Sequence, residues 1–389
     1  MPKTQQPQIR NAAIANFRLR RNHLLRNDDD AAADAATISR DMCGVQAQVM
    51  SAAYLQLWAR NHTLTRSEIE DALWKTRTLV KTSLMRQTLH LIPADEFPLY
   101  IAALRPSRVA QALRTMARFG ISREEGESIT PLIMDALSAG PLRRPAIAAV
   151  VRPKVSKRAR AWMEACWSMI RIPVAEGSIC YGRGEGNEIV FIRTDQWLKD
   201  RSIKDQKLPK LKVESVAVTQ AQCELFRKYL RAYGPASLHD FAHWSGISMQ
   251  EVKPLLPLLQ AELAEIPGEK KDRWLFPEDV AILNKTSTKE TGVRLLPIFD
   301  SFLLAHREKD HLLSMQHYKR VYRNQGWISP VVLVDGAIAG VWSHKIQNKK
   351  LFVEVDPFGR LTRTQRAAIK REAEALAVFF ESKLDLKFS

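Results

Sequence analysis

The segment between residues 237 and 263 carries two helix start signals separated by a short turn. Ser237 precedes one apolar helical stretch, Gly246 ends it, and Ser248 precedes a second stretch that continues through Leu263. Serine favours the N-cap position because its side-chain oxygen accepts a hydrogen bond from a free helix N–H, and glycine favours the position just after a helix. Two helices joined by so short a turn predict a helix–turn–helix, which limits the chain to few folds.

Two earlier segments show the same order of helices followed by strand-like residues. Thr65 and Glu68 form a capping-box pattern before a helix, and residues 79–92 are strand-like up to Pro93. Further on, helical residues 129–150 precede a glycine-containing stretch that predicts a β-hairpin over residues 179–192. We therefore predict an α+β chain with three tandem winged-helix units: residues 10–120, residues 121–212 up to a lysine-rich connector, and residues 213–288, with 273–276 as the third wing.

The last hundred residues have a different character. Four stretches after Gly292 are strand-like, and Asp335-Gly336 between two of them is typical of a tight hairpin turn. Residues 362–383 have the apolar spacing of an amphipathic helix. We predict that residues 289–389 form a small β-barrel, the alternative being an open sheet, with a terminal helix packed on it. The four stretches are residues 293–299, 331–334, 337–341 and 351–355.

The charge of the chain points to a polyanionic partner. Fifty-nine lysines and arginines against 42 acidic residues give a formal net charge of +17. Such an excess favours nucleic acid as the partner, although some soluble enzymes are simply basic. One run in the second unit contains no acidic residue and supplies DNA-binding candidates; the alternative is a solvated face. These candidates are Arg143, Arg144, Lys154, Lys157 and Arg158.

Several kinds of site receive no support from the sequence. The four cysteines are scattered and form no Cys-x-x-Cys pair, which argues against a zinc ribbon or an iron–sulfur cluster and suits the cytoplasm. His239 and His243 are spaced for one helix face, but no third ligand lies nearby. No apolar run approaches the roughly 20 residues that span a bilayer. We expect a cytoplasmic protein with no metal, no cofactor and no membrane contact.

Two glutamines lie between two predicted helices, in the segment from Gly44 to Gln48. Residues two apart do not share a face of a helix, but they do share a face of an extended chain. If Gly44 ends the first helix and Ser51 caps the second, residues 45–50 form an extended link that aims Gln46 and Gln48 the same way. The alternative is that both amides are solvated filler.

Other candidates for a cleft come from the strand-like stretch over residues 79–92. Alternation places Arg86, Thr88 and His90 on one face, either beside the glutamines or as ordinary parts of a wing. Asp300 lies within an apolar run, where a carboxylate needs a partner. We interpret it as a buried residue bonded to the backbone or to an arginine.

Three of these segments together resemble the AlkZ-like family of bacterial DNA glycosylases. They are Val45-Gln46-Ala47-Gln48, then residues 85–91 (Met-Arg-Gln-Thr-Leu-His-Leu), then residues 296–300 (Leu-Pro-Ile-Phe-Asp) with Leu303, Leu304 and His306. The resemblance implies tandem winged helices followed by a β-barrel. Because both motif positions hold glutamine, the chain resembles the Gln-x-Gln branch, which excises N7-alkylated guanines and unhooks interstrand crosslinks.

The resemblance further implies that Gln46 and Gln48 are catalytic. Their amide oxygens would orient the water that attacks the anomeric carbon, and two neutral amides would limit the enzyme to cationic, already activated bases. The expected enzyme is a monofunctional, monomeric glycosylase acting on double-stranded DNA with alkylated or crosslinked guanine, associated with the nucleoid. The alternative is a non-enzymatic winged-helix DNA-binding regulator in which the glutamines are incidental.

Overall fold

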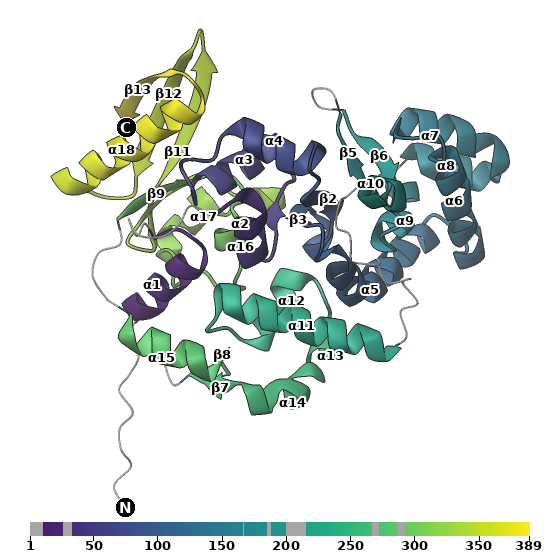
Figure 1. Cartoon of the computed structure of the whole chain (residues 1–389), viewed down its shortest axis with the longest axis horizontal. Coiled ribbons are helices and arrows are strands. Elements are labelled where there is room, and N and C mark those ends of the chain that lie inside the picture. The colour runs from purple at the N-terminus through teal and green to yellow at the C-terminus, as the bar shows by residue number, and fades with distance from the viewer. Residues whose placement is uncertain are drawn as a thin grey trace, which may run out of the picture.

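The computed structural model describes residues 11–25, 33–165, 167–184, 188–199, 215–266, 272–286 and 292–389. Helices surround two larger sheets and one short two-stranded sheet within these ranges (Figure 1). The lysine-rich connector and the boundary at residue 212 fall outside the described residues. Within them, no helix has both the length and the apolar character needed to cross a membrane.

One antiparallel six-stranded sheet joins the first two predicted units. Its strands are β1 (Val45–Gln46), β2 (Leu79–Ser83), β3 (Leu89–Pro93), β4 (Leu142–Arg143), β5 (Ile179–Gly182) and β6 (Val190–Arg193). Their order is β1-β3-β2-β5-β6-β4, and Lys81 opposite Tyr181 links the two hairpins. The hairpin predicted over residues 179–192 is present, the strand-like stretch over residues 79–92 is also a hairpin, and the two pair edge to edge in one sheet. The number of winged-helix units and their boundaries stay predictions.

Helices cover this sheet, and their starts have different causes. Helix α4 begins with the predicted capping box of Thr65 and Glu68. Ser51 does not cap α3; that helix begins at Met50 after Val49 without a side-chain cap, so burial of its apolar face fixes its start instead. The helices are α2 (Ala35–Asp41), α3 (Met50–Trp58), α4 (Arg66–Trp74), α5 (Phe97–Ala117), α6 (Arg123–Ala136), α7 (Arg144–Val151), α8 (Lys157–Ala165), α9 (Arg171–Ala175) and α10 (Thr194–Lys199), with 3₁₀ turns η1 (Met85–Gln87), η2 (Arg152–Lys154) and η3 (Trp167–Ile170). The first helix, α1 (Asn11–Arg21), packs instead in a separate apolar cluster with Ile266, Leu275 and Leu283.

The helix–turn–helix of the third unit forms where the sequence predicts it. Ser237 and Ser248 both cap helices, and Gly246 adopts a left-handed conformation between them. The predicted helix over residues 249–263 is wrong in one respect, because Pro254 lacks an N–H and splits it. The elements are α11 (Ser215–Tyr233), α12 (Leu238–Ser245), α13 (Met249–Val252), α14 (Leu255–Leu259), η4 (Gln260–Glu262), β7 (Ala264–Glu265), β8 (Trp274–Leu275) and α15 (Pro277–Lys285).

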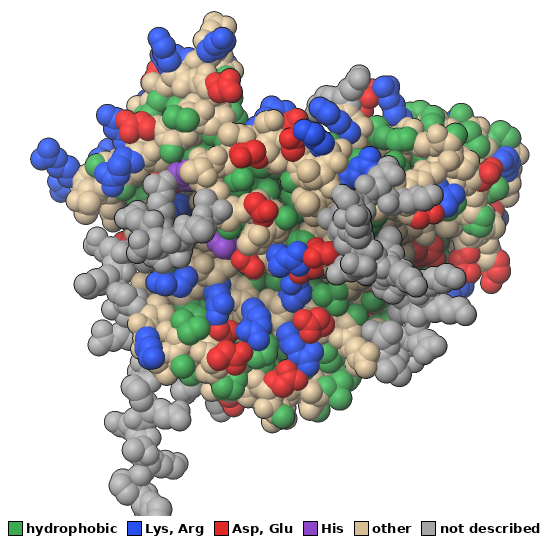
Figure 2. Space-filling model, in the orientation of Figure 1, with side chains coloured by type: hydrophobic (Ala, Val, Ile, Leu, Met, Phe, Trp, Pro, Cys, Tyr) green, Lys and Arg blue, Asp and Glu red, His purple; other side chains and the backbone are tan. Residues whose placement is uncertain are grey.

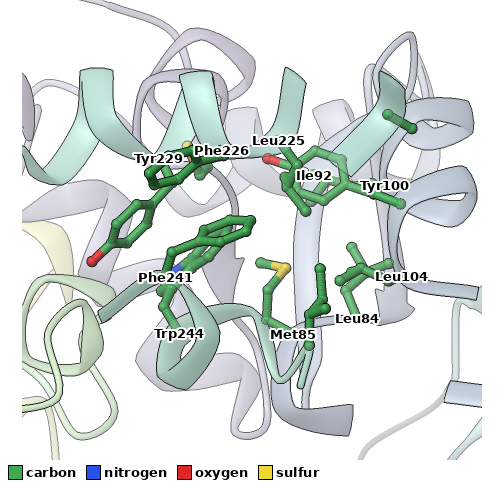
Figure 3. Packing of buried hydrophobic residues seen from close by; sticks show 14 of the residues in the cluster. Leu84, Met85, Ile92, Tyr100, Leu104, Leu225, Phe226, Tyr229, Phe241 and Trp244 are labelled. Atoms are coloured by element: carbon green, nitrogen blue, oxygen red, sulfur yellow. The ribbon is translucent and has the colours of Figure 1, made fainter. Parts of the chain in front are cut away.

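The third unit packs directly on the turn between β2 and β3. Figure 3 shows Phe241 and Trp244 from α12 and Tyr229 from α11 on one side of a cluster that contains Leu84 and Met85 of that turn. These side chains are all buried. Burial of this much aromatic surface fixes the turn with respect to α11 and α12.

Gly246 offers a direct test of this contact. A methyl group on Gly246 would lie 3.0 Å from the backbone N and 3.2 Å from the Cα of Arg86, and φ is +79°. Gly246→Ala should therefore destabilise the protein by about 1–3 kcal/mol, combining left-handed strain and the clash. Gly326→Ala is the matched control, since its φ is +78° with nothing within 4 Å. Equal losses of free energy of unfolding in urea would contradict the packing argument.

The C-terminal sheet is open, so the predicted β-barrel is wrong. Its order is β13-β12-β11-β10-β9, and the outer strands β9 and β13 do not pair with each other. The turn predicted at Asp335-Gly336 is confirmed between β10 and β11, with positive φ at both residues. The strands are β9 (Val293–Leu296), β10 (Val331–Val334), β11 (Ala337–Gln347), β12 (Lys350–Pro357) and β13 (Lys383–Phe388); α16 (Ser301–Leu304), η5 (Met315–His317), α17 (Tyr318–Val321) and η6 (Asn324–Gly326) connect β9 to β10.

Helix α18 (Arg363–Phe379) explains why this sheet stays open. The helix ends earlier than predicted and leads into β13, which pairs parallel to β12, so the two strands and the helix form a crossover unit. Ile369, Ala373 and Leu376 belong to the same buried cluster as the sheet residues. The helix thus fills the face that would line a closed barrel.

Candidate active site

Strand β1 carries the first of the two glutamines on the edge of the six-stranded sheet. Val45 and Ala47 are fully buried in one apolar cluster, so Gln46 and Gln48 alternate to the other side of the chain. Gly44, with φ +97°, lets the chain turn from α2 into β1. The expected extended geometry is confirmed at Val45–Gln46, but the chain bends at Gln48 and Val49 and α3 begins at Met50, so the extended link is shorter than residues 45–50.

Gln46 is held by three polar contacts and is only 4% exposed. Its backbone N–H donates to Ser301 Oγ at 3.1 Å, and its backbone carbonyl accepts from Gln56 Nε2 at 2.8 Å. Its side-chain Oε1 accepts from Arg86 Nη2 at 2.9 Å. The amide of Gln46 thus has one fixed orientation.

Gln48 lies in a different environment. Its side chain is exposed, and its Oε1 accepts one long hydrogen bond of 3.3 Å from the backbone N–H of Leu89. It also lines a cavity of about 280 Å³ together with Gln87 and Tyr181. Of the two glutamines, Gln48 is the one whose amide faces space that a substrate or a water can enter.

Arg86 lies in the turn between β2 and β3 and not on a strand face. Arg86 and Gln87 have φ values of +51° and +60°, so the predicted alternation of Arg86, Thr88 and His90 along one strand is wrong: a 3₁₀ turn interrupts it. The Arg86 guanidinium donates to Gln46 and to the carbonyl of Trp244. Burial lowers the pKa of Arg86 to about 10, which leaves it charged at neutral pH.

His90 faces Gln46 across the strand pair but is neutral. The two residues are directly opposite in the β1–β3 register, and His90 is 1% exposed. Its Nδ1 donates to the carbonyl of Thr88 at 2.9 Å, while the Thr88 hydroxyl donates to the carbonyl of Met85 at 3.1 Å. Burial, and then the charge of Arg86, lower the pKa of His90 to about 3.

The lowered pKa of His90 predicts acid sensitivity. The unfolded chain binds a proton at His90 below its ordinary pKa of about 6.5, whereas the folded chain binds it only near pH 3. Stability is therefore lost progressively as the pH falls from 6.5 towards 3, by about 2 kcal/mol between pH 7 and pH 5 from this group. Urea unfolding of His90→Asn should show a loss over that interval smaller by this amount; parallel pH dependences of the two proteins would contradict the assignment.

A buried ion pair lies next to the segment that bonds the backbone of β1. Arg60 Nη1 and Nη2 donate to Asp300 Oδ2 and Oδ1, both at 2.8 Å, and neither side chain is exposed. Asp300 also accepts from the N–H of Phe302, which confirms its interpretation as a buried, partnered carboxylate. The neighbouring Ser301 bonds Gln56 as well as Gln46. The segment that follows β9 thus fixes the backbone of the first glutamine.

Comparison with known proteins shows which family the chain belongs to. A family model described as "DNA glycosylase AlkZ-like" matches residues 39–379. The chain belongs to the AlkZ-like DNA glycosylase family. It is 30% identical over 362 residues to the interstrand DNA cross-link repair glycosylase of Streptomyces sahachiroi, with 88% of this chain and 90% of that one covered. The solved structure of Streptomyces sahachiroi DNA glycosylase AlkZ matches with a TM-score of 0.82 at 26% identity, covering 98% of this chain and all of the other.

In this AlkZ-like glycosylase the five basic candidates of the second unit lie apart from the glutamines. They lie at or just before the starts of α7 and α8, and none of them lines the cavity beside Gln48. Arg143 pairs with Glu188 at 2.7 Å, and Lys154 with Asp135 at 3.5 Å. Arg144 donates to the carbonyl of Met163, Arg158 to that of Gly120, and Lys157 is exposed. Their contact with DNA stays a prediction.

Sequence reasoning missed two polar residues that shape the site. Gln56 is fully buried within the apolar helix α3, and Arg108 occupies the buried stripe of α5 between Leu104 and Ala112. A polar group inside an apolar helix face needs a partner, and that was the signal for both. Ser301 carried no comparable signal.

The described part of the AlkZ-like chain contains no group of three or more His, Cys, Asp or Glu residues arranged to hold a metal. His239 lines a separate polar cavity of about 350 Å³ with His306 and His311, whose rings meet edge to face at 4.9 Å. Burial lowers the pKa of His306 well below its ordinary value, and its Nε2 bonds the carbonyl of Tyr233.

Proposed function

We propose that this glycosylase hydrolyses the N-glycosidic bond of N7-alkylated guanine in duplex DNA and unhooks interstrand crosslinks formed through such bases. The observation that carries the proposal is the pair of amides on an extended strand, one fixed and one facing a cavity. The cross-link repair glycosylase of Streptomyces sahachiroi, similar over most of the chain, supports the crosslinked substrate.

The enzyme needs to supply little catalysis, because alkylation itself activates the base as a leaving group. Alkylation at N7 places a positive charge on the base, which then leaves readily, and the sugar develops oxocarbenium character. Among the described residues Gln48 Oε1 accepts one long hydrogen bond, and it retains acceptor capacity for a water. Orienting that water towards the anomeric carbon supplies the remaining catalysis. A neutral base leaves too poorly for two amides to assist, so the substrate is restricted to cationic lesions.

Gln46 and Gln48 have different roles in the proposed reaction. Gln48 contacts the water from the cavity that it lines, while Gln46, whose amide is fixed by Arg86, holds the motif beside that cavity. The neutral imidazole of His90, opposite Gln46, adds no charge to the site.

The projecting hairpin of β11 and β12 suits contact with DNA. Asn348 and Lys349 form its tip with positive φ, and Lys345 and Lys349 are exposed. Figure 2 shows Lys and Arg side chains at this tip, and Figure 1 shows that it projects towards the same edge of the molecule as the β5–β6 hairpin. Phosphates of a duplex placed along this edge would meet these cations. A crosslinked base cannot rotate out of the helix, so an approach along an open edge fits such a lesion better than a closed base pocket.

The environment of Lys309 agrees with a monofunctional reaction, in which no lysine amine attacks the sugar. Burial lowers the pKa of Lys309 to about 7, which would suit a nucleophilic amine. Its Nζ, however, donates to the carbonyl of His306 and lies 5.3 Å from the ring of Tyr322, and the residue is 7% exposed. This amine is not presented to a sugar, which agrees with water as the nucleophile.

The test is incubation with a duplex that contains 7-methylguanine, or a nitrogen-mustard crosslink, followed by alkali. We expect strand cleavage at the lesion and loss of the crosslinked species on a denaturing gel. Tight binding to both duplexes with cleavage no faster than spontaneous depurination would overturn the proposal and favour the DNA-binding regulator.

A further inference from the structure

Arg108 is a buried arginine whose guanidinium has no partner among the described residues. The residue is 8% exposed, and neither Nε nor Nη1 has a hydrogen-bond acceptor in the part of the chain that the structure describes. The other arginines with a buried, unbonded nitrogen each use another guanidinium nitrogen for a hydrogen bond. They are Arg18, Arg60, Arg77 and Arg294.

Arg108 lies between two adjoining cavities of the site. One, of about 280 Å³, contains Gln48; the other, of about 260 Å³, contains Arg86; Gln87 and Arg108 line both. No aspartate or glutamate lines either cavity, whereas the polar cavity near His239 contains several. The cavity beside Gln48 also contains Arg171. The charged residues that line these two cavities are therefore all basic.

We propose that Arg108 binds a phosphodiester group of the lesion strand, next to the nucleotide whose base is removed. This rests on the proposed function, which brings that nucleotide to Gln48. The sign of the charge selects the ligand: a cationic alkylguanine would be repelled by Arg108 and Arg171, whereas a backbone phosphate supplies the missing acceptors. The phosphate adjacent to the lesion is the anion that lies within reach when the sugar is at Gln48.

The free protein keeps Arg108 charged and unsatisfied, as expected of a prepared binding group. Burial lowers the pKa of Arg108 to about 10, so the guanidinium remains cationic at neutral pH. An unbonded buried donor destabilises the free protein, and its bonds form only when a ligand arrives. Binding a phosphate here also fixes the sugar relative to Gln48 without contact to the base, which suits a lesion tied to the opposite strand.

The experiment is a scan of the lesion-strand backbone with neutral methylphosphonate linkages. Duplexes carry one such linkage at each position flanking a 7-methylguanine, and affinity is measured for the whole protein and for Arg108→Gln. We expect one linkage adjacent to the lesion to weaken wild-type binding about tenfold and to leave Arg108→Gln binding unchanged. The salt dependence of Arg108→Gln binding should also be shallower by about one phosphate contact.

Arg123→Gln is the matched control, because it removes an exposed arginine paired with Glu127. It should respond to every linkage as the wild type does. The melting temperature of Arg108→Gln should equal or exceed that of the wild type, and a clear fall would overturn the proposal by making Arg108 structural. Equal sensitivity of wild type and Arg108→Gln to every linkage would also overturn it.

Two further arms separate the sources of failure. If inorganic phosphate protects the wild type, but not Arg108→Gln, as strongly as DNA does, the site takes free phosphate and the DNA assignment is overturned. The scan measures binding and not excision. A wild-type protein that binds the duplex without excising the base refutes the proposed function, and the linkage data still decide the role of Arg108.

Discussion

Gln48→Ala should lower the single-turnover rate of 7-methylguanine excision by about 100-fold or more while DNA affinity changes little. The exposed amide of Gln48 lines the cavity and makes one long hydrogen bond to Leu89, so its removal costs little stability. A water without its orienting acceptor loses the contribution that positioned acid–base groups make, about 10²–10⁴-fold. Excision under enzyme excess, together with a binding isotherm, measures both quantities.

Two other variants sharpen this result. Gln260→Ala, a change at another exposed glutamine in the third unit, should excise at the wild-type rate. Gln46→Ala should also lose excision, but with a lower melting temperature, because Arg86 then loses one of its two acceptors. If Gln48→Ala loses affinity in proportion to rate, the residue holds DNA and does not activate water.

The second large effect concerns stability. Asp300→Ala should destabilise the protein by about 3–5 kcal/mol, because it leaves the guanidinium of Arg60 buried without its counter-charge. The N–H of Phe302 loses its acceptor as well. Chemical denaturation followed by tryptophan fluorescence measures the loss, and residual excision should fall because Ser301 and Gln56 support β1.

An exposed ion pair provides the comparison. Arg227 pairs with Glu262 at 2.7 Å on the surface, and Arg227→Met should cost no more than about 1 kcal/mol. The double variant Arg60→Met with Asp300→Leu should recover much of the loss, since paired apolar replacements remove both buried charges. A double variant as unstable as Asp300→Ala alone would show that the segment depends on the pair itself.

The sequence predicted part of the geometry of Gln46 and Gln48. The spacing of Gln46 and Gln48 predicted an extended chain with both amides on one side, and the burial of Val45 and Ala47 agrees. It did not predict that one amide would be fixed and the other open, because Arg86 and Leu89, which make that difference, come from a turn and strand some forty residues away.

Arg86 itself was misplaced for a similar reason. Alternation along residues 79–92 assumes a continuous strand. The structure instead has a turn with two left-handed residues, and Gly246 at the end of α12 packs against the backbone of Arg86 in that turn. Arg108 had no recognisable role in sequence, although its place on the buried stripe of α5 was visible.

Local signals determined much of this fold. Serine caps, the capping box at Thr65, the glycine after α12 and the turn at Asp335-Gly336 all act within a few residues, so the sequence alone places these helix ends and this hairpin turn. Sheet pairing and cavities depend on contacts between distant segments. Only the tertiary structure joins the first two hairpins through Lys81 and Tyr181 and keeps the last sheet open by packing α18 across it. It also places Gln48, Arg86 and Arg108 around neighbouring cavities, with Gln46 bonded to Arg86.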